Sequence, residues 1–190
     1  MTWGVTGLDV RYGDRLALTG VELHVEPGQV IAVVGGDGAG KTTLLRTLAG
    51  GVRPSAGQVR SPGRERTGFM PATASTWADL TVEENLEFAA AAYHVGHAEL
   101  ADRRTRLLAA TGLTAAAGRT AARLSGGMRQ KLGFALATVH HPDLLVLDEP
   151  TTGVDPVSRV DLWRLVSAAA AAGTAVVMAT TYLDEAERAG

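Results

Sequence analysis

The chain has 190 residues, enough for one domain that buries roughly 70% of the surface its unfolded form would expose. Its formal net charge is −2 at pH 7 and its basic residues form no long block, which excludes nucleic-acid binding driven by bulk charge. Cysteine is absent, which excludes a disulfide framework, thiolate chemistry and cysteine-based metal sites.

The N-terminal part of the chain reads mainly as strands. Two amphipathic strands are predicted at 8–12 and 21–25. The continuous apolar run Val30–Val34 predicts a central strand that is covered on both faces. A glycine-rich loop follows it directly, and a helix is predicted over 42–49. A further short strand is predicted near 58–60, between turns rich in Pro, Gly and Ser.

The middle of the chain reads mainly as helices. Thr81 and Glu84 have the spacing of a capping box, which predicts a helix that runs to about Tyr93. A second helix is predicted over 98–111. The segment 71–141 is therefore expected to be mostly helical and to be inserted into an α/β core.

The rest of the chain alternates strands and helices. A helix is predicted after Ser125 that ends at Pro142, followed by a buried strand at 144–147. Asp155 is the predicted cap of a helix that ends at Gly173. The last strand is predicted at 174–179, and a final helix is expected to begin at Asp184.

Neither a signal peptide nor a membrane span is predicted. Residues 1–4 are uncharged and are not followed by an apolar run. The longest apolar stretch, 166–179, is interrupted by Ser167 and Gly173 and is shorter than the ~20 residues that a membrane span needs. We therefore expect a soluble chain, for which any membrane role requires a separate partner.

A phosphate-binding loop is predicted after the strand at 30–34. Its residues are Gly35, Gly36, Asp37, Gly38, Ala39, Gly40, Lys41, Thr42 and Thr43. Polyphosphate needs many donors at close range, and Gly35, Gly38 and Gly40 let backbone N–H groups supply them in a loop with positive φ angles. Lys41 is expected to reach the β- and γ-phosphates, and the Thr42 hydroxyl to bind Mg²⁺. The alternative, a glycine-rich surface turn, does not explain the strand and helix that flank the loop.

Two carboxylates, Asp148 and Glu149, end the buried strand at 144–147 and are followed by Pro150. An aspartate in this place holds Mg²⁺ in P-loop ATPases, so ATP and Mg²⁺ are the expected ligands. A strand that ends in two solvated acids is the alternative. The phosphate loop earlier in the chain favours the catalytic interpretation.

A third motif begins with Ser125, Gly126, Gly127 and Met128. Ser125 can cap the helix that follows, and the two glycines leave backbone N–H groups bare at its positive end. This run separates cassette ATPases from other P-loop proteins. Together the three motifs resemble the nucleotide-binding domain of an ABC transporter, and the resemblance covers nearly the whole chain.

The resemblance implies an α/β P-loop NTPase core with an antiparallel β subdomain and an inserted α-helical subdomain. On this basis 1–190 is a single domain, with its core at 1–70 and 142–190 and its helical subdomain at 71–141. The elements that normally follow the switch segment are expected to be missing from this chain. The family works at the cytoplasmic face of the cell membrane, bound to a transmembrane permease, and no nucleic-acid partner is expected.

The resemblance also assigns roles to single residues. Tyr12 matches the aromatic that stacks on adenine, although a core or surface tyrosine is the alternative. Glu149 occupies the position that polarises the attacking water, and Asp148 holds Mg²⁺ through water. The end of the helix at Ser125 closes over the γ-phosphate of a partner, so the resemblance implies a second cassette, either as a homodimer or as a fused or different chain.

Two positions depart from the family pattern. Ala72 stands where a glutamine normally contacts Mg²⁺ and the attacking water, and Thr181 stands where the switch histidine is expected. A methyl group can make neither contact, and threonine reaches less far and cannot carry positive charge. Loss of a positioned donor typically costs ~10²–10³ in rate.

Three functions remain open at this stage. Three details resemble bacterial multidrug-export ATPases, especially the first cassette of subunits with two cassettes. They are Gly36 with Asp37 in the phosphate loop, the residues that continue the signature after Met128, and the switch sequence around Thr181. The first function is therefore ATP hydrolysis that drives export through a membrane partner. The second is a cassette that binds ATP but hydrolyses it weakly and completes its partner's site. The third, a cassette protein that acts on ribosomes or DNA, is disfavoured by the absence of a basic face.

Overall fold

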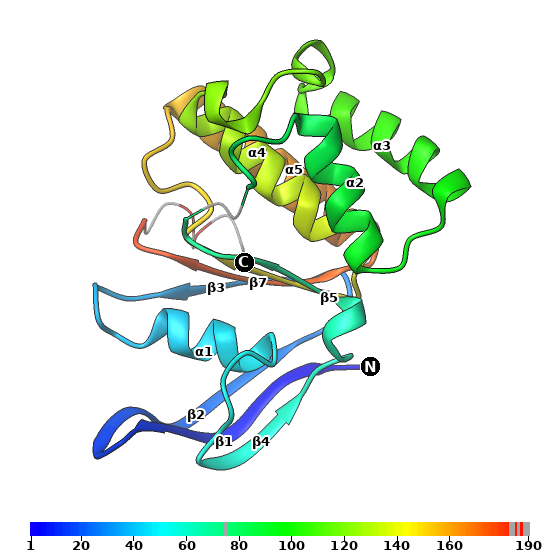
Figure 1. Ribbon diagram of the computed structural model, residues 1–190. Helices are drawn as coiled ribbons and strands as arrows, with labels where there is room; N and C mark the ends of the chain where they lie inside the picture. The colour runs from blue at the N-terminus through cyan, green and yellow to red at the C-terminus, as the bar shows by residue number, and fades with distance from the viewer. Residues whose placement is uncertain (74–75, 183–184, 186, 188–190) are drawn as a thin grey trace.

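The computed structural model describes residues 1–73 and 76–182, together with Glu185 and Glu187. Figure 1 shows four layers: an antiparallel sheet, helix α1, a parallel sheet and a layer of helices. This α/β arrangement confirms the predicted class. Asp184, where the final helix was predicted to begin, lies outside the described residues.

The antiparallel sheet has the strand order β2-β1-β4, with β1 at Trp3–Tyr12, β2 at Arg15–Val25 and β4 at Ala56–Arg60. The first two strands form a hairpin that closes at the pair Tyr12 and Arg15. All three strands were predicted, but the first two are longer than expected. Bulges interrupt their alternation, so that only parts of each strand show the pattern of a half-buried sheet.

The parallel sheet has the strand order β3-β7-β6-β5. Its strands are β3 (Val30–Val34), β7 (Ala175–Thr180), β6 (Leu144–Asp148) and β5 (Thr67–Met70). The prediction that Val30–Val34 is central was wrong, because among the described strands β3 pairs only with β7 and is half-buried. Strands β6 and β7 are the fully buried central pair. A continuous apolar run indicates that both faces are covered, but it does not specify the position of a strand in the sheet.

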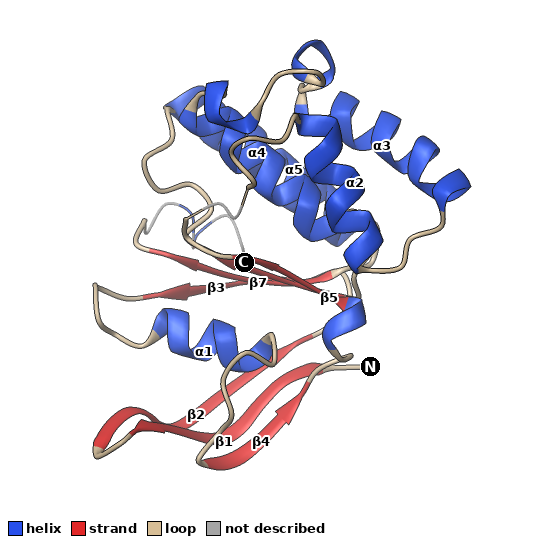
Figure 2. Cartoon of the chain, in the orientation of Figure 1, coloured by secondary structure: helices blue, strands red, loops and turns tan. Residues whose placement is uncertain are grey.

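Helix α1, Lys41–Leu48, lies between the two sheets (Figure 2). Its residues Leu44, Leu45 and Leu48 are buried in one core with residues of β1, β2, β6 and β7. This packing fixes the N-terminus of α1 at the edge of the parallel sheet where β3 and β6 end. The phosphate loop is thereby held by rigid elements on both sides.

The helical layer covers the opposite face of the parallel sheet. Its helices are α2 (Val82–Ala92), α3 (His97–Thr111), α4 (Gly126–Thr138) and α5 (Pro156–Ala171). Short 3-10 turns lie at η1 (Arg64–Arg66), η2 (Thr114–Ala116) and η3 (Ala121–Arg123). The capping box of Thr81 with Glu84 and the cap at Asp155 are confirmed. Helix α4 ends at Thr138, earlier than the predicted break at Pro142.

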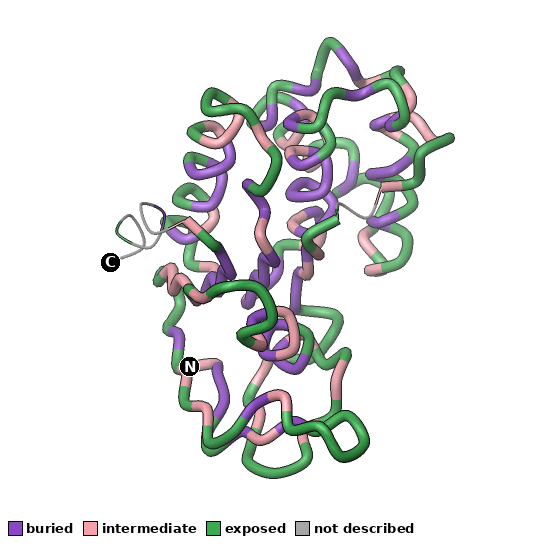
Figure 3. Tube along the Cα trace, turned by 90° about the vertical axis from the view of Figure 1, so that its left-hand side faces the viewer, coloured by how far each residue is buried: buried purple, intermediate pink, exposed green. Residues whose placement is uncertain are grey.

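Two further cores hold the helical layer together. One joins α2, α3 and α4 to each other, and the other packs α4 and α5 on β5, β6 and β7. Figure 3 shows the buried residues along the middle of the molecule and the exposed ones along its outer turns. None of the helices in the described part of the chain is both long enough and apolar enough to cross a membrane.

Candidate nucleotide site

The phosphate loop joins the end of β3 to the start of α1, as predicted. Gly38 and Gly40 have φ angles of 78° and 93°, in the left-handed region that favours glycine. A Cβ on Gly40 would also lie 2.6 Å from Leu18 Cδ2. Gly35, by contrast, has no positive φ, and its Cβ would lie 3.1 Å from Ala39 Cβ. Two of the three predicted loop glycines are therefore needed for their backbone angles, whereas Gly35 is restricted by a close neighbour.

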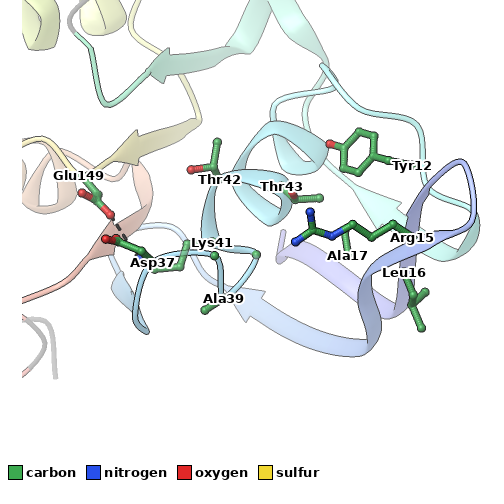
Figure 4. A pocket seen from close by; sticks show the side chains of 12 residues that line it. Tyr12, Arg15, Leu16, Ala17, Asp37, Ala39, Lys41, Thr42, Thr43 and Glu149 are labelled. Carbon is green, nitrogen blue, oxygen red and sulfur yellow. Dashed lines mark ion pairs between the residues drawn. The ribbon is translucent and has the colours of Figure 1, made fainter.

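The loop borders a cavity of about 490 Å³. The side chains around it come from the β1–β2 hairpin, the phosphate loop, the start of α1 and the end of β6 (Figure 4). Its lining residues are Tyr12, Arg15, Leu16, Ala17, Asp37, Gly38, Ala39, Gly40, Lys41, Thr42, Thr43 and Glu149. The structure thus brings together the predicted residues Tyr12, Lys41 and Glu149, with Tyr12 and Glu149 at opposite ends in Figure 4. Sequence analysis gave Arg15 no role in this site.

Lys41 is the buried cation of the cavity, with its side chain 7% exposed. Its Nζ donates to the carbonyl oxygens of Gly35 at 2.7 Å and of Gly36 at 3.2 Å. The same atom lies 3.3 Å from Glu149 Oε1, the ion pair drawn in Figure 4. The loop carbonyls and one carboxylate therefore fix the position of the ammonium group, which supplies positive charge next to the bare N–H groups of the loop.

Asp148 ends β6 and is 2% exposed. Burial raises the pKa of its carboxyl, whereas a hydrogen bond with the Thr42 hydroxyl opposes that rise. Its Oδ1 is buried and has no hydrogen-bond partner among the described residues. A buried carboxylate oxygen without a partner is costly, and a cation beside Thr42 and Asp148 would satisfy it.

Glu149 has an unusual backbone and several contacts. Its φ of 49° lies in the left-handed region. Its N–H donates to the carbonyl of Ala179 at 3.0 Å, and the Thr152 hydroxyl donates to Glu149 Oε2 at 3.1 Å. The carboxylate is therefore held between Lys41 and Thr152. The contact of Thr152 with Glu149 was not predicted from the sequence. The spacing of three residues between them could have suggested it.

The signature residues lie elsewhere. The Ser125 side chain caps α4 by accepting from the Met128 N–H at 3.3 Å. A Cβ on Gly127 would lie 2.4 Å from Ser158 Oγ, so the second glycine is required by close packing of α4 on α5. Gly126 lines a second cavity of about 500 Å³, separate from the one at Lys41. None of the signature residues is among the described residues that line the cavity at Lys41.

The two departures from the family pattern lie outside the nucleotide cavity. Ala72 lines the second cavity, and its carbonyl accepts a hydrogen bond of 3.4 Å from Gln130 Nε2. Thr181 is exposed and follows β7 directly. Gln130 belongs to the signature run, but its contact with Ala72, 58 positions earlier in the chain, was not predicted from the sequence. Neither Ala72 nor Thr181 is among the residues around Lys41.

The family model described as ABC transporter matches residues 18–152, from the β1–β2 hairpin through the two carboxylates. The chain belongs to the ABC transporter family. This match confirms the resemblance based on the three motifs and makes the chain an ATP-binding cassette.

Curated relatives agree with this assignment. The cassette is 40% identical over 97% of its length to the probable multidrug ABC transporter ATP-binding protein YbhF of Escherichia coli (strain K12), of which the match covers 34%. It is 37% identical over 97% of its length to the daunorubicin resistance ATP-binding protein DrrA3 of Streptomyces coeruleorubidus, covering 61% of that protein. The cassette therefore spans about a third of one relative and three fifths of the other.

Solved structures confirm the fold. One, described as an ATP binding subunit of an ABC transporter, has a TM-score of 0.90 and 30% identity and covers 100% of this chain and 83% of that one. A second is cbiO1 from Clostridium perfringens, described as part of the ABC transporter complex cbiONQ. It has a TM-score of 0.83 and 27% identity and covers 96% of this chain and 79% of that one.

Proposed function

We propose that this cassette binds and hydrolyses Mg²⁺-ATP and thereby drives export of a drug-like or other small substrate through a membrane permease. One observation carries the proposal. Lys41, Asp148 and Glu149 converge at the phosphate loop, and the buried Asp148 Oδ1 has no partner among the described residues. Relatives named for multidrug export and for daunorubicin resistance support the export role.

In this proposal Tyr12 stacks on adenine at the far end of the cavity from Glu149. The N–H groups of the loop from Gly35 to Thr43 cradle the phosphates, and Lys41 moves from its contacts with the loop carbonyls to the β- and γ-phosphates. The carboxylate of Glu149, oriented by Thr152, accepts the proton of the attacking water.

Mg²⁺ fits the residues present, because Thr42 and Asp148 offer the hard oxygen ligands that it prefers. When bound it neutralises developing charge on the phosphate oxygens. The described part of the chain holds no group of three or more His, Cys, Asp or Glu side chains able to form a protein cage for a metal. This agrees with a cation held by one or two side chains and the substrate phosphates, as Mg²⁺ commonly is.

We further propose that the cassette acts as a dimer, with a second copy or with another cassette. The signature residues Ser125, Gly126, Gly127 and Met128 lie at the N-terminus of α4, away from the cavity of their own chain. The Met128 N–H donates to Ser125, and the N–H groups of Gly126 and Gly127 remain for a ligand. Such a helix end is suited to the γ-phosphate of a nucleotide that a partner holds.

The permease partner places the cassette at the cytoplasmic face of the cell membrane in this proposal. The neighbouring structure described as part of a transporter complex supports a membrane partner. A groove of about 330 Å³ lies beneath the exposed aromatic pair Trp77 and Phe88, whose ring centroids are 4.1 Å apart. We assign this groove to the permease. It borders the helical subdomain, 71–141, where that subdomain meets the core formed by 1–70 and 142–190.

The comparisons do not support the alternative of a cassette that binds ATP but hydrolyses it weakly and completes its partner's site. They do not support an action on ribosomes or DNA either, since YbhF and cbiO1 are named as transporter proteins and DrrA3 is named for drug resistance. We propose that Ala72 and Thr181 limit the rate of turnover.

Lys41→Ala tests the proposal directly. The loss of the ammonium group should weaken ATP binding and lower turnover at least about 10³-fold, because the lysine acts on the charge of the transferred phosphoryl group. Turnover is measured by steady-state phosphate release, and affinity by titration with a fluorescent ATP analogue. Arg106→Ala, which removes an exposed cation of α3, is the matched control. Unchanged affinity and turnover in Lys41→Ala would refute the assignment.

A further inference from the structure

A buried carboxylate outside the nucleotide cavity, Glu185, connects the end of β7 to helix α5. Its side chain is 0% exposed. The Thr180 hydroxyl donates to Glu185 Oε2 at 2.6 Å, and Arg159 Nη2 donates to Glu185 Oε1 at 3.2 Å. Both carboxylate oxygens thus have partners, which a fully buried charge requires.

The same group of residues fixes the backbone on both sides of Thr181. The Tyr182 N–H donates to Thr180 Oγ1 at 3.0 Å, and the guanidinium of Arg159 lies 4.1 Å from the centre of the Tyr182 ring. The Glu185 N–H donates to the carbonyl of Tyr182 at 3.3 Å. Because Thr181 itself is exposed, its neighbours determine its position, and its own packing does not.

The end of β7 lies directly beside the proposed catalytic carboxylate. Asp148 pairs with Ala179 in the parallel register, and the Glu149 N–H donates to the carbonyl of Ala179 at 3.0 Å. Thr180 follows Ala179, so the hydroxyl that contacts Glu185 is one residue from the backbone support of Glu149. A shift of Thr180 would therefore move Thr181 relative to Glu149.

Helix α5 is a firm support for this arrangement. Its first turn is capped by Asp155, which accepts from the N–H groups of Val157 and Ser158. Ser158 lies against Gly127 of α4 so closely that a Cβ there would meet its Oγ at 2.4 Å. Arg159 follows Ser158 and is thus placed by the contact between the two helices.

We propose that Thr180, Arg159 and Glu185 form a latch that positions Thr181 beside the nucleotide cavity. The latch residues do not line that cavity, so they act on the reaction through the placement of Thr181 and are positioning residues. The proposal rests on ATP hydrolysis at the proposed site. A displacement of ~1 Å in a catalytic arrangement can cost ~10²-fold in rate.

The test uses Glu185→Gln, Thr180→Val and Arg159→Met, each close in shape to the original side chain. Every variant should lower kcat about 10- to 100-fold while KM and ATP affinity stay within about twofold, because no contact with bound nucleotide is removed. Glu185→Gln combined with Arg159→Met should be no worse than either alone, since both changes break one unit. Arg164→Met, which removes an exposed ion pair with Asp161 on the same helix, is the control and should keep full turnover.

A second readout separates positioning from general stability. The same substitutions are made in a Thr181→His background, where a longer side chain, whose contacts depend more on exact placement, occupies the switch position. If the latch positions this residue, Glu185→Gln should remove any gain in turnover that Thr181→His provides. Independent, additive effects would overturn the proposal, as would losses of kcat that merely follow a lowered melting temperature.

Glu149→Gln is measured in the same series to separate the two proposals. If it abolishes turnover while Glu185→Gln, Thr180→Val and Arg159→Met leave kcat unchanged, the latch is refuted and the hydrolytic site stands. If turnover survives in Glu149→Gln, the proposed site is wrong and the latch is overturned with it.

Discussion

The two cavities beside the parallel sheet differ in what holds their residues. The nucleotide cavity is built at the ends of β3 and β6 and at the start of α1, and its buried Lys41 is in contact with Glu149. The second cavity is built mostly from loops around Ala72 and the start of α4, and Ala72 contributes only a backbone carbonyl to the Gln130 contact. The residues proposed to bind phosphate are thus held by regular elements, whereas the two positions that depart from the family pattern, Ala72 and Thr181, lie outside the nucleotide cavity.

Of the substitutions that test this comparison, one in the nucleotide cavity should have the largest effect. Glu149→Gln keeps the shape of the side chain and removes its ability to take a proton. We expect turnover to fall at least about 10²–10³-fold while ATP still binds, since loss of a general base typically costs 10²–10⁴. Phosphate release and nucleotide titration measure the two quantities separately. A parallel loss of affinity would mean that Glu149 acts mainly by holding Lys41.

The next largest effect is expected at the two positions that depart from the family pattern. Ala72→Gln combined with Thr181→His returns both groups that the family normally has. Turnover should rise by about tenfold or more, because each positioned donor is typically worth ~10² or more in rate. ATP affinity should hardly change, since neither residue lines the cavity at Lys41. A double variant no faster than the original chain would show that these positions do not limit the reaction.

An intermediate effect concerns the contact between α4 and α5. Gly127→Ala places a Cβ 2.4 Å from Ser158 Oγ and 2.7 Å from Ser158 Cβ, so the helices must separate or the serine must move. Overpacking of this kind costs typically ~1–3 kcal/mol. The free energy of unfolding in urea should fall accordingly, and Ser158→Gly in the same chain should recover most of it. No loss in Gly127→Ala would indicate slack packing at the signature helix.

The smallest expected effect lies beyond the C-terminal end of α4, away from both cavities. His140 stacks on Tyr93 with ring centroids 3.6 Å apart. Burial, opposed by the backbone of Thr67 and aided by the charges of Arg103 and His141, lowers the pKa of His140 from 6.5 to about 4. The unfolded chain therefore binds more protons than the folded one between these pH values, and stability should fall as the pH drops from 6.5 towards 4.

His140→Phe keeps the stack and removes the titration. Because the ring is only partly buried, we expect the effect to be about 1–2 kcal/mol, less than the whole pKa shift would give. The melting temperature of the original chain should then drop by roughly 2–8 °C more than that of His140→Phe over this pH range. Thermal unfolding at pH 4.5 and pH 7 checks this. Parallel curves for the two proteins would show that His140 is hydrated when the chain is folded.

The sequence predicted those parts that depend on local chemistry. The phosphate loop, the capping box at Thr81 and the cap at Asp155 each rest on residues a few positions apart, and the structure shows the predicted elements there. Strands β3, β6 and β7 of the parallel sheet were also recognised from apolar runs, whereas the short strand β5 was not predicted. The stacking of His140 on Tyr93 was not predicted, since it joins residues that lie far apart in the sequence.

Long-range contacts explain most of the rest. The edge position of β3 depends on which strands pair, and an apolar run carries no such information. The contact of Gly127 with Ser158 and that of Arg159 with Glu185 join residues that the sequence separates. Asn85, fully buried and bonded to the backbone of Trp77 and Leu80, looks like an ordinary polar helix residue in the sequence. These contacts become visible only when the layers are assembled.

The left-handed backbone of Glu149 has an evolutionary consequence. A residue with a Cβ at a φ of 49° costs about 1–2 kcal/mol, which glycine would not incur. Glu149→Gly should therefore relieve that local strain while it abolishes the chemistry. A copy of this cassette released from selection for hydrolysis would have a favourable path to lose its carboxylate first.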